Sequence, residues 1–118
     1  MRHRKKQDKL GGRDRDKRRL LIGNLATSLI LHGKIQTTKA KAKAVQPVID
    51  KLIITAKKKA KHIAIREVSA VLQTEISSKK LFDELTKKYQ DRETGFTRIS
   101  EIGVRNGDCA PLVQIELV

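Results

Sequence analysis

Apolar positions in the first half of the chain recur at helical spacing and predict two helices joined by a short extended segment. The first helix is expected to begin near Asp14 or Asp16, either of which can act as its N-cap, and to end at Gly33. Apolar residues cover most of its circumference, so we expect this helix to be largely buried. Gly23 stands in its middle, where glycine costs about 1 kcal/mol relative to alanine and allows another backbone to approach closely.

The second predicted helix spans about 38–61 and follows an extended segment, 34–37, that is centred on Ile35. Thr37 or Thr38 is expected to cap this helix, and Pro47 is expected to kink or restart it because proline removes a backbone hydrogen bond. At 100° per residue, six apolar residues share a sector about 140° wide and four lysines lie within about 40° on another face. The apolar sector consists of Val45, Val48, Ile49, Leu52, Ile53 and Ala56, and the lysine stripe consists of Lys39, Lys43, Lys57 and Lys61.

Two further helices and a turn are predicted after residue 62. The stretch 63–73 is a moderately apolar helix candidate, and Ser77 or Ser78 can cap the helix that follows it. Helical spacing in that last helix relates Leu81, Phe82, Leu85 and Tyr89. Residues 91–95 then form a predicted turn.

The end of the chain changes from helical period to the alternation of β-strands. Strands are predicted over 96–104 and 112–117, joined as a hairpin by Asn106-Gly107, which tolerates positive φ at both turn positions. Ile99 and Ile102 are three residues apart, which breaks strict alternation and predicts a β-bulge nearby.

Charge divides the chain into two unlike halves. Residues 1–62 hold 19 lysines and arginines against 4 acidic residues, whereas residues 63–118 hold 8 against 9, and the whole chain carries +14. Solubility alone does not require such segregation. The basic half is therefore expected to lie against a polyanion, and phosphate backbones are the commonest one because binding them releases condensed counterions.

Residues 1–13 are predicted to form a basic N-terminal arm in front of one globular domain, 14–118. The arm contains Gly11-Gly12 and has no apolar periodicity, so we expect it to be disordered alone and to order against a partner. Ten of the first twenty residues are Lys or Arg, six of them Arg, which grips phosphates bidentately. A localisation signal or a solubility device is the alternative for the arm, and a solvated helix face is the alternative for the lysine stripe.

The candidate RNA-contact residues are cations, hydroxyls and one histidine, mostly in the basic half. They are Arg2, His3, Arg4, Lys5, Lys6, Lys9, Arg13, Arg15, Lys17, Arg18, Arg19, Lys34, Thr37, Thr38, Lys39, Lys41, Lys43, Lys57, Lys61, Arg98 and Arg105. The near-neutral half is expected to face solvent or protein neighbours, because its acidic side chains would repel a phosphate surface.

Several other kinds of site are not expected. The single cysteine, Cys109, allows neither an internal disulfide nor a cysteine cluster, which suits the cytoplasm, and His3, His32 and His62 lack metal-ligand spacing. No phosphate-binding loop or nucleophile elbow is present, so no catalysis, cofactor or small-molecule substrate is expected. Aromatic residues make up 3%, which disfavours base-stacking platforms. No apolar run reaches membrane-spanning length, and no secretory signal is visible.

Short motifs along nearly the whole chain resemble the bacterial large-subunit ribosomal protein seventeen family. In the first half these are Met1-Arg2-His3-Arg4, Asn24-Leu25-Ala26, Ser28-Leu29, His32, Thr37-Thr38 and Lys41-Ala42-Lys43. In the second half they are Thr97-Arg98-Ile99, Gly103-Val104-Arg105, Gly107-Asp108, Ala110-Pro111 and Ile115-Glu116-Leu117. Two positions depart from the family: Gly23 replaces an arginine that would be a phosphate contact, and Gly33 replaces a glutamate.

The resemblance implies an α+β fold in which helices pack on a small three-stranded antiparallel sheet, with the Ile35 segment as the third strand. It also implies a structural constituent of the large ribosomal subunit that binds large-subunit ribosomal RNA near the peptide exit tunnel, beside neighbouring ribosomal proteins. The alternative from composition alone is a nucleic-acid packaging or RNA-chaperone protein, and an enzyme acting on RNA is a third possibility. Sedimentation apart from ribosomal subunits would favour packaging, and nucleolytic activity lost with one histidine would favour the enzyme.

Overall fold

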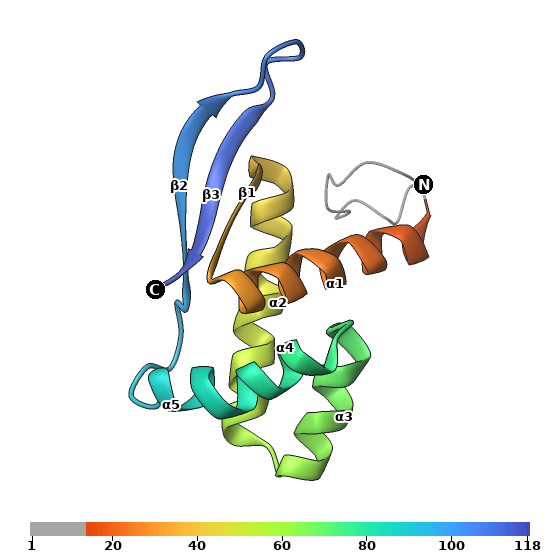
Figure 1. Ribbon diagram of the computed structural model, residues 1–118, viewed down its shortest axis with the longest axis vertical. Helices are drawn as coiled ribbons and strands as arrows, with labels where there is room; N and C mark the ends of the chain where they lie inside the picture. The colour runs from red at the N-terminus through yellow and green to blue at the C-terminus, as the bar shows by residue number, and fades with distance from the viewer. Residues whose placement is uncertain (1–13) are drawn as a thin grey trace, which may run out of the picture.

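The computed structural model describes residues 14–118 as an α+β fold with helices packed on a three-stranded antiparallel sheet (Figure 1). The fold class expected from the sequence is thus confirmed; the predicted arm, 1–13, lies outside the described residues. In chain order the elements are α1 (Arg15–His32), β1 (Lys34–Thr38), α2 (Lys39–Lys58), α3 (Lys61–Val71), α4 (Glu75–Lys80), the π-helical turn η1 (Leu81–Leu85), α5 (Thr86–Lys88), β2 (Thr97–Val104) and β3 (Pro111–Leu117).

Both ends of α1 are where the sequence predicts them. The Asp14 carboxylate accepts a hydrogen bond from the Asp16 backbone N–H at 3.0 Å, and Gly33 adopts a left-handed φ of 79° while its N–H bonds the Leu29 carbonyl. The expectation that α1 is largely buried is wrong for its first half. Its buried residues begin at Gly23, and Leu20 is 59% exposed. The first turns extend past α3 and α4, and no helix or strand within residues 14–118 packs against them (Figure 1).

The close backbone approach expected at Gly23 occurs at the end of α3. The Thr27 hydroxyl donates to the Gly23 carbonyl at 2.8 Å and accepts from the Gln73 backbone N–H at 3.2 Å. The Gln73 side chain also donates to the Leu20 carbonyl at 3.3 Å. These bonds fasten the middle of α1 to the segment that follows α3.

Helix α2 is the central helix of the core. It runs through Pro47 without restarting, and the residue whose carbonyl loses its partner there, Lys43, is exposed, so water can satisfy it. Thr38 occupies the N-cap position but makes no side-chain capping bond. The predicted apolar sector is confirmed as core, with Val45, Ile49 and Ile53 fully buried. The helix ends at Lys58, three residues earlier than predicted.

A threonine, not a serine, caps α4. The Thr74 hydroxyl accepts from the Ser77 backbone N–H at 3.3 Å, so the expectation of a cap at Ser77 or Ser78 is wrong. Ser77 is instead fully buried, and its hydroxyl donates to the Thr74 carbonyl at 2.7 Å. Beyond it, Leu81, Leu85 and Tyr89 belong to the core, as their spacing predicts.

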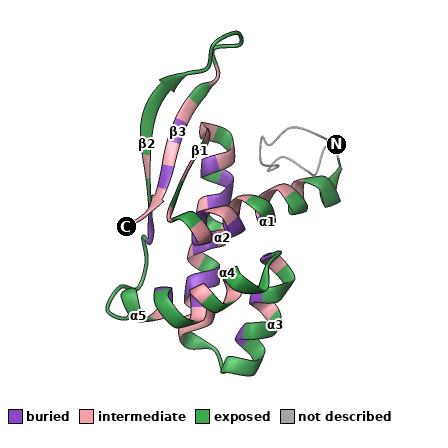
Figure 2. Ribbon diagram, in the orientation of Figure 1, coloured by how far each residue is buried: buried purple, intermediate pink, exposed green. Residues whose placement is uncertain are grey.

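The sheet has the order β1-β3-β2 and its register places isoleucines together. Ile115 of β3 pairs with Ile35 on one side and with Ile99 on the other. The predicted bulge is confirmed between Glu101 and Gly103, where Ile102 is the extra residue. Along β3, buried residues alternate with half-buried ones (Figure 2).

The β2–β3 hairpin is confirmed, but its turn is not the predicted two-residue type. Val104 pairs with Pro111, so six residues form the loop, and Cys109 donates its backbone N–H to the Arg105 carbonyl at 3.1 Å. Positive φ occurs at Gly107 (104°) and Cys109 (56°), and not at Asn106.

The last residues of the chain close the core. The Tyr89 and Phe96 rings meet edge to face with centroids 5.1 Å apart, and the Tyr89 hydroxyl donates to the Val118 carbonyl at 2.7 Å. The C-terminal end of β3 is thereby tied to the helical layer.

Candidate nucleic-acid interface

The first turns of α1 carry one of the cationic clusters within residues 14–118. Arg15, Lys17 and Arg19 are exposed there, and Arg18 is half-buried. Asp14 and Asp16 lie in the same segment, but the four cations outnumber these two carboxylates and the cluster keeps a net positive charge. The remaining candidates of this region, Arg2, His3, Arg4, Lys5, Lys6, Lys9 and Arg13, lie outside the described residues.

The predicted stripe of four lysines is not a single helix face. Lys61 begins α3 and therefore has no fixed angular relation to the lysines of α2. The Lys39 amine is 3.1 Å from a carboxylate oxygen of Glu101. Lys41 is half-buried, and Lys43 is exposed.

Lys57 is held by the protein itself. Its amine donates a hydrogen bond to the Arg92 carbonyl and lies 5.7 Å from the centroid of the Phe96 ring. The side chain therefore ties the C-terminal part of α2 to the loop before β2. Lys58 and Lys61 are exposed beside it at the α2–α3 corner, while Lys59 pairs with Glu67 at 2.6 Å.

Lys34 and Arg98 lie on the same face of the sheet. Each pairs in register with Glu116 from opposite sides of β3, and an Arg98 guanidinium nitrogen is 3.9 Å from a Glu116 carboxylate oxygen. Thr38 shares this face, whereas Thr37 pairs with the buried Val113 and has the opposite orientation. The sheet thus separates the two threonines, which the sequence grouped together.

Three polar residues on this same face were not among the sequence candidates. Gln36, Gln114 and Ser100 form the next row across the three strands. Their only sequence signal is a spacing of two from Lys34, Glu116 and Arg98, which has meaning only once the strand pairing is known.

The Arg105 side chain is hydrogen-bonded within the hairpin loop. Its Nε and Nη2 donate to the two carboxylate oxygens of Asp108 at 3.1 and 2.6 Å. The Arg105 hydrogen bonds, followed by the Ala110 backbone N–H, lower the pKa of Asp108 from 3.8 to about 2. The same side-chain bonding raises the pKa of Arg105 above its usual value. This arginine braces its own loop.

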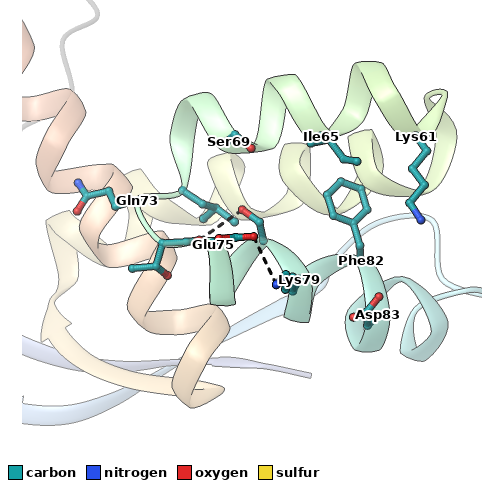
Figure 3. Close-up of a pocket in the computed structure, with 11 residues that line it drawn as sticks. Lys61, Ile65, Ser69, Gln73, Glu75, Lys79, Phe82 and Asp83 are labelled. Atoms are coloured by element: carbon teal, nitrogen blue, oxygen red, sulfur yellow. Dashed lines mark hydrogen bonds and ion pairs between the residues drawn. The ribbon is translucent and has the colours of Figure 1, made fainter.

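A groove of about 480 Å³ lies between α3 and α4, and except for Lys61 its lining residues belong to the near-neutral half. Ile65, Phe82 and Leu72 supply apolar lining, and Lys61 stands at one end (Figure 3). Glu75 and Lys79 form an ion pair at 3.4 Å on its rim. Ile63 and Ile76, 44% and 71% exposed, add further apolar surface to these helices.

The described residues contain no group of His, Cys, Asp and Glu side chains that could hold a metal ion. Within 14–118, no helix is long and apolar enough to cross a membrane. Exposed cationic side chains lie on the helices and on one face of the sheet. These features are those of a small, strongly basic α+β protein that presents its positive charges on its surface.

Comparison with known proteins gives the particular family. The family model for ribosomal protein L17 matches residues 21–118. The chain is 47% identical over 107 residues to large ribosomal subunit protein bL17 of Thermoanaerobacter sp. (strain X514), covering 91% of this chain and 95% of the relative. It is 45% identical to the bL17 protein of Rubrobacter xylanophilus over 118 residues, covering 100% and 96% of the two chains.

The chain belongs to the ribosomal protein L17 family. The resemblance seen in its motifs is therefore confirmed. This family is structural and non-enzymatic, and its members are proteins of the bacterial large ribosomal subunit.

Proposed function

We propose that this chain, as a structural constituent of the large ribosomal subunit, binds large-subunit ribosomal RNA through its basic half. The proposal includes a location near the peptide exit tunnel, as the family resemblance implies, with other ribosomal proteins beside it. It treats residues 14–118 as the folded domain and 1–13 as an RNA-binding arm.

The observation that carries the proposal is the segregation of charge together with its exposure. Residues 1–62 hold an excess of 15 positive charges, and residues 63–118 have a net charge of −1. Among the described cations, Arg15, Lys17, Arg19 and Lys43 project from helices into solvent. Such side chains can neutralise phosphates without disturbing the core.

The cations that are bonded to other groups of the protein have a structural role in this proposal. Lys39, Lys57 and Arg105 already bind protein groups, so they hold the fold that presents the exposed cations. The near-neutral α3–α4 surface, with its apolar groove, faces neighbouring ribosomal proteins.

Salt dependence tests the phosphate mechanism. If about 6–10 phosphates are contacted, the affinity for transcribed large-subunit ribosomal RNA should fall about 10³–10⁵-fold between 50 and 200 mM salt. A nearly flat titration contradicts the proposal. Equal affinity for DNA and RNA duplexes, with the protein sedimenting apart from subunits, would instead support nucleic-acid packaging.

Cross-linking in assembled particles tests the orientation. RNA cross-links should concentrate in residues 1–61, and protein cross-links should concentrate in α3 and α4. Dominant RNA cross-links from 81–89, with few from 1–61, would overturn the proposed orientation.

A further inference from the structure

One face of the sheet is polar, and the core that the structure describes packs on the opposite face. We define the open face by the residues whose side chains alternate with the core-facing ones. They are Lys34, Gln36, Thr38, Arg98, Ser100, Leu112, Gln114 and Glu116. Within residues 14–118 none of them belongs to the buried core cluster, and Leu112, the one apolar residue among them, is not packed against it. The residues that alternate with them, such as Ile35, Ile99, Val113 and Ile115, do belong to the core or pack on it.

The strand register arranges the open face in rows. Lys34, Glu116 and Arg98 form the first row across β1, β3 and β2, and Gln36, Gln114 and Ser100 form the second. The Gln114 amide donates to a Glu116 carboxylate oxygen at 3.4 Å, which confirms that these rows share a face. Neighbouring strands are about 4.8 Å apart, so each row spans about 10 Å.

The chemistry of this face is unlike that of a protein interface. Protein-binding surfaces depend on buried aromatic or aliphatic anchors, and Leu112 is the single apolar side chain in the set. The two cations stand at the outer strands, on either side of the one carboxylate, which Arg98 partly neutralises. Amides and the serine hydroxyl are each both donors and acceptors.

The minor groove of an A-form RNA duplex matches these properties. It is wide and shallow, and it displays 2′-hydroxyl groups that both donate and accept hydrogen bonds. A flat polar surface can lie against it without stacking on bases, which suits a chain with 3% aromatic residues. Cations at both edges can then meet the phosphates that border the groove.

We propose that the open face binds the minor groove of double-stranded RNA, with Gln36, Gln114 and Ser100 hydrogen-bonding its 2′-hydroxyls and Lys34 and Arg98 contacting the flanking phosphates. This inference rests on the proposed function, because it names the form of RNA that the same protein recognises. It assigns three residues to the interface beyond the exposed cations.

The test is 2′-deoxy interference on transcribed large-subunit ribosomal RNA. With the natural chain, 2′-deoxy substitution at a small cluster of positions within one duplex should weaken binding. The double variant Gln36→Val, Gln114→Val keeps strand-forming residues. Its affinity should fall about 5–30-fold, as expected for two lost hydrogen bonds, and interference at that cluster should disappear. The salt slope should not change, because no charge is removed.

Control variants separate the outcomes. Gln90→Leu removes an exposed amide from the turn after α5 and should leave affinity and interference unchanged. If the double variant unfolds, Gln36→Val alone, at an exposed position on edge strand β1, should still lower affinity about 2–6-fold.

Unchanged affinity and interference in the folded double variant would overturn the inference, and exclusion of that variant from assembled particles would then indicate a protein contact at this face. A different result would contradict the proposed function itself: the natural chain would show no salt-dependent binding to large-subunit ribosomal RNA.

Discussion

Gly23 lies directly against the carbonyl oxygen of Val71: a Cβ at position 23 would be 2.9 Å from that oxygen. Cβ atoms in proteins essentially never come so close to an oxygen, so the α1–α3 contact requires glycine here. Position 23 is also one of the two departures from the family resemblance. The structure shows it buried against the end of α3, so glycine at this position is a packing residue in this chain.

Gly23→Ala should therefore destabilise the protein. Overpacking against a backbone atom costs about 1–3 kcal/mol, and the helix propensity of alanine returns up to about 1 kcal/mol. The expected net loss is about 0.5–2 kcal/mol in the free energy of unfolding, measured by denaturant titration. Asn24→Ala, at the exposed next position, is the matched control and should be neutral or slightly stabilising. A stabilised Gly23→Ala variant would mean that α3 moves away at no cost.

Deleting residues 2–13 should weaken RNA binding strongly and leave thermal unfolding nearly unchanged. The described core residues run from Ala26 to Ile115, and the deleted sequence has no apolar periodicity that would add to them. Calorimetry and a filter-binding assay on the same preparation measure both effects. A large drop in melting temperature with intact binding would contradict the assignment of 1–13 as an RNA-binding arm.

Gly107→Val should destabilise the hairpin by about 1–3 kcal/mol. Gly107 has a φ of 104°, where a β-branched residue is strained. Asn106→Ala is the control, because position 106 does not have a positive φ and needs no special residue. Equal denaturation midpoints for the two variants would show that the loop adapts freely to both.

The Asp108 carboxylate should titrate near pH 2 in the folded protein, below its ordinary value of 3.8. A carboxyl whose pKa is lowered by folding contributes stability above its unfolded pKa and loses that contribution as the pH falls through the folded one. The Arg105–Asp108 brace should therefore persist at neutral pH and open between about pH 4 and 2. Carboxyl carbon chemical shifts measure this directly, and Arg105→Gln should move the midpoint upward. A midpoint near 4 in the natural chain would show that the brace does not form.

Lys43 and Lys57, both RNA candidates from one lysine stripe, should behave differently. Lys43→Gln removes an exposed charge and should reduce the salt slope of RNA binding by about one without changing stability. Lys57→Gln loses the hydrogen bond to Arg92 and the contact with the Phe96 ring, so it should cost about 0.5–1.5 kcal/mol of stability. Identical effects of the two substitutions would mean that Lys57 is not held as the structure shows.

Local chemistry made the ends of α1 predictable. Asp14 and Gly33 act within a few residues of themselves, through a side-chain cap and a left-handed conformation, so short sequence patterns are enough to find them. The burial of α1 needed information that its own sequence lacks. Its apolar circumference predicts burial, but no described helix or strand covers the Leu20 side chain, which is 59% exposed.

Angular spacing similarly predicted only part of the candidate site. It shows which lysines share a helix, but the partner of Lys39 is Glu101, 62 residues away, and Lys57 meets a carbonyl 35 residues away. Helix α2 also ends before Lys61, which removes that residue from the pattern. The open face of the sheet depends on the pairing of β1 with β3, so its rows of residues are invisible until that long-range register is known.

The β2 bulge at Ile102 also affects whether a strand of another chain can pair with this edge of the sheet. β2 is an edge strand, and its eight residues offer unpaired backbone groups to any passing chain. An extra residue between Glu101 and Gly103 breaks the even spacing of those groups, and the charges of Arg98 and Glu101 discourage a second strand further. The bulge therefore disfavours edge-to-edge pairing of β2 with the strand of another chain.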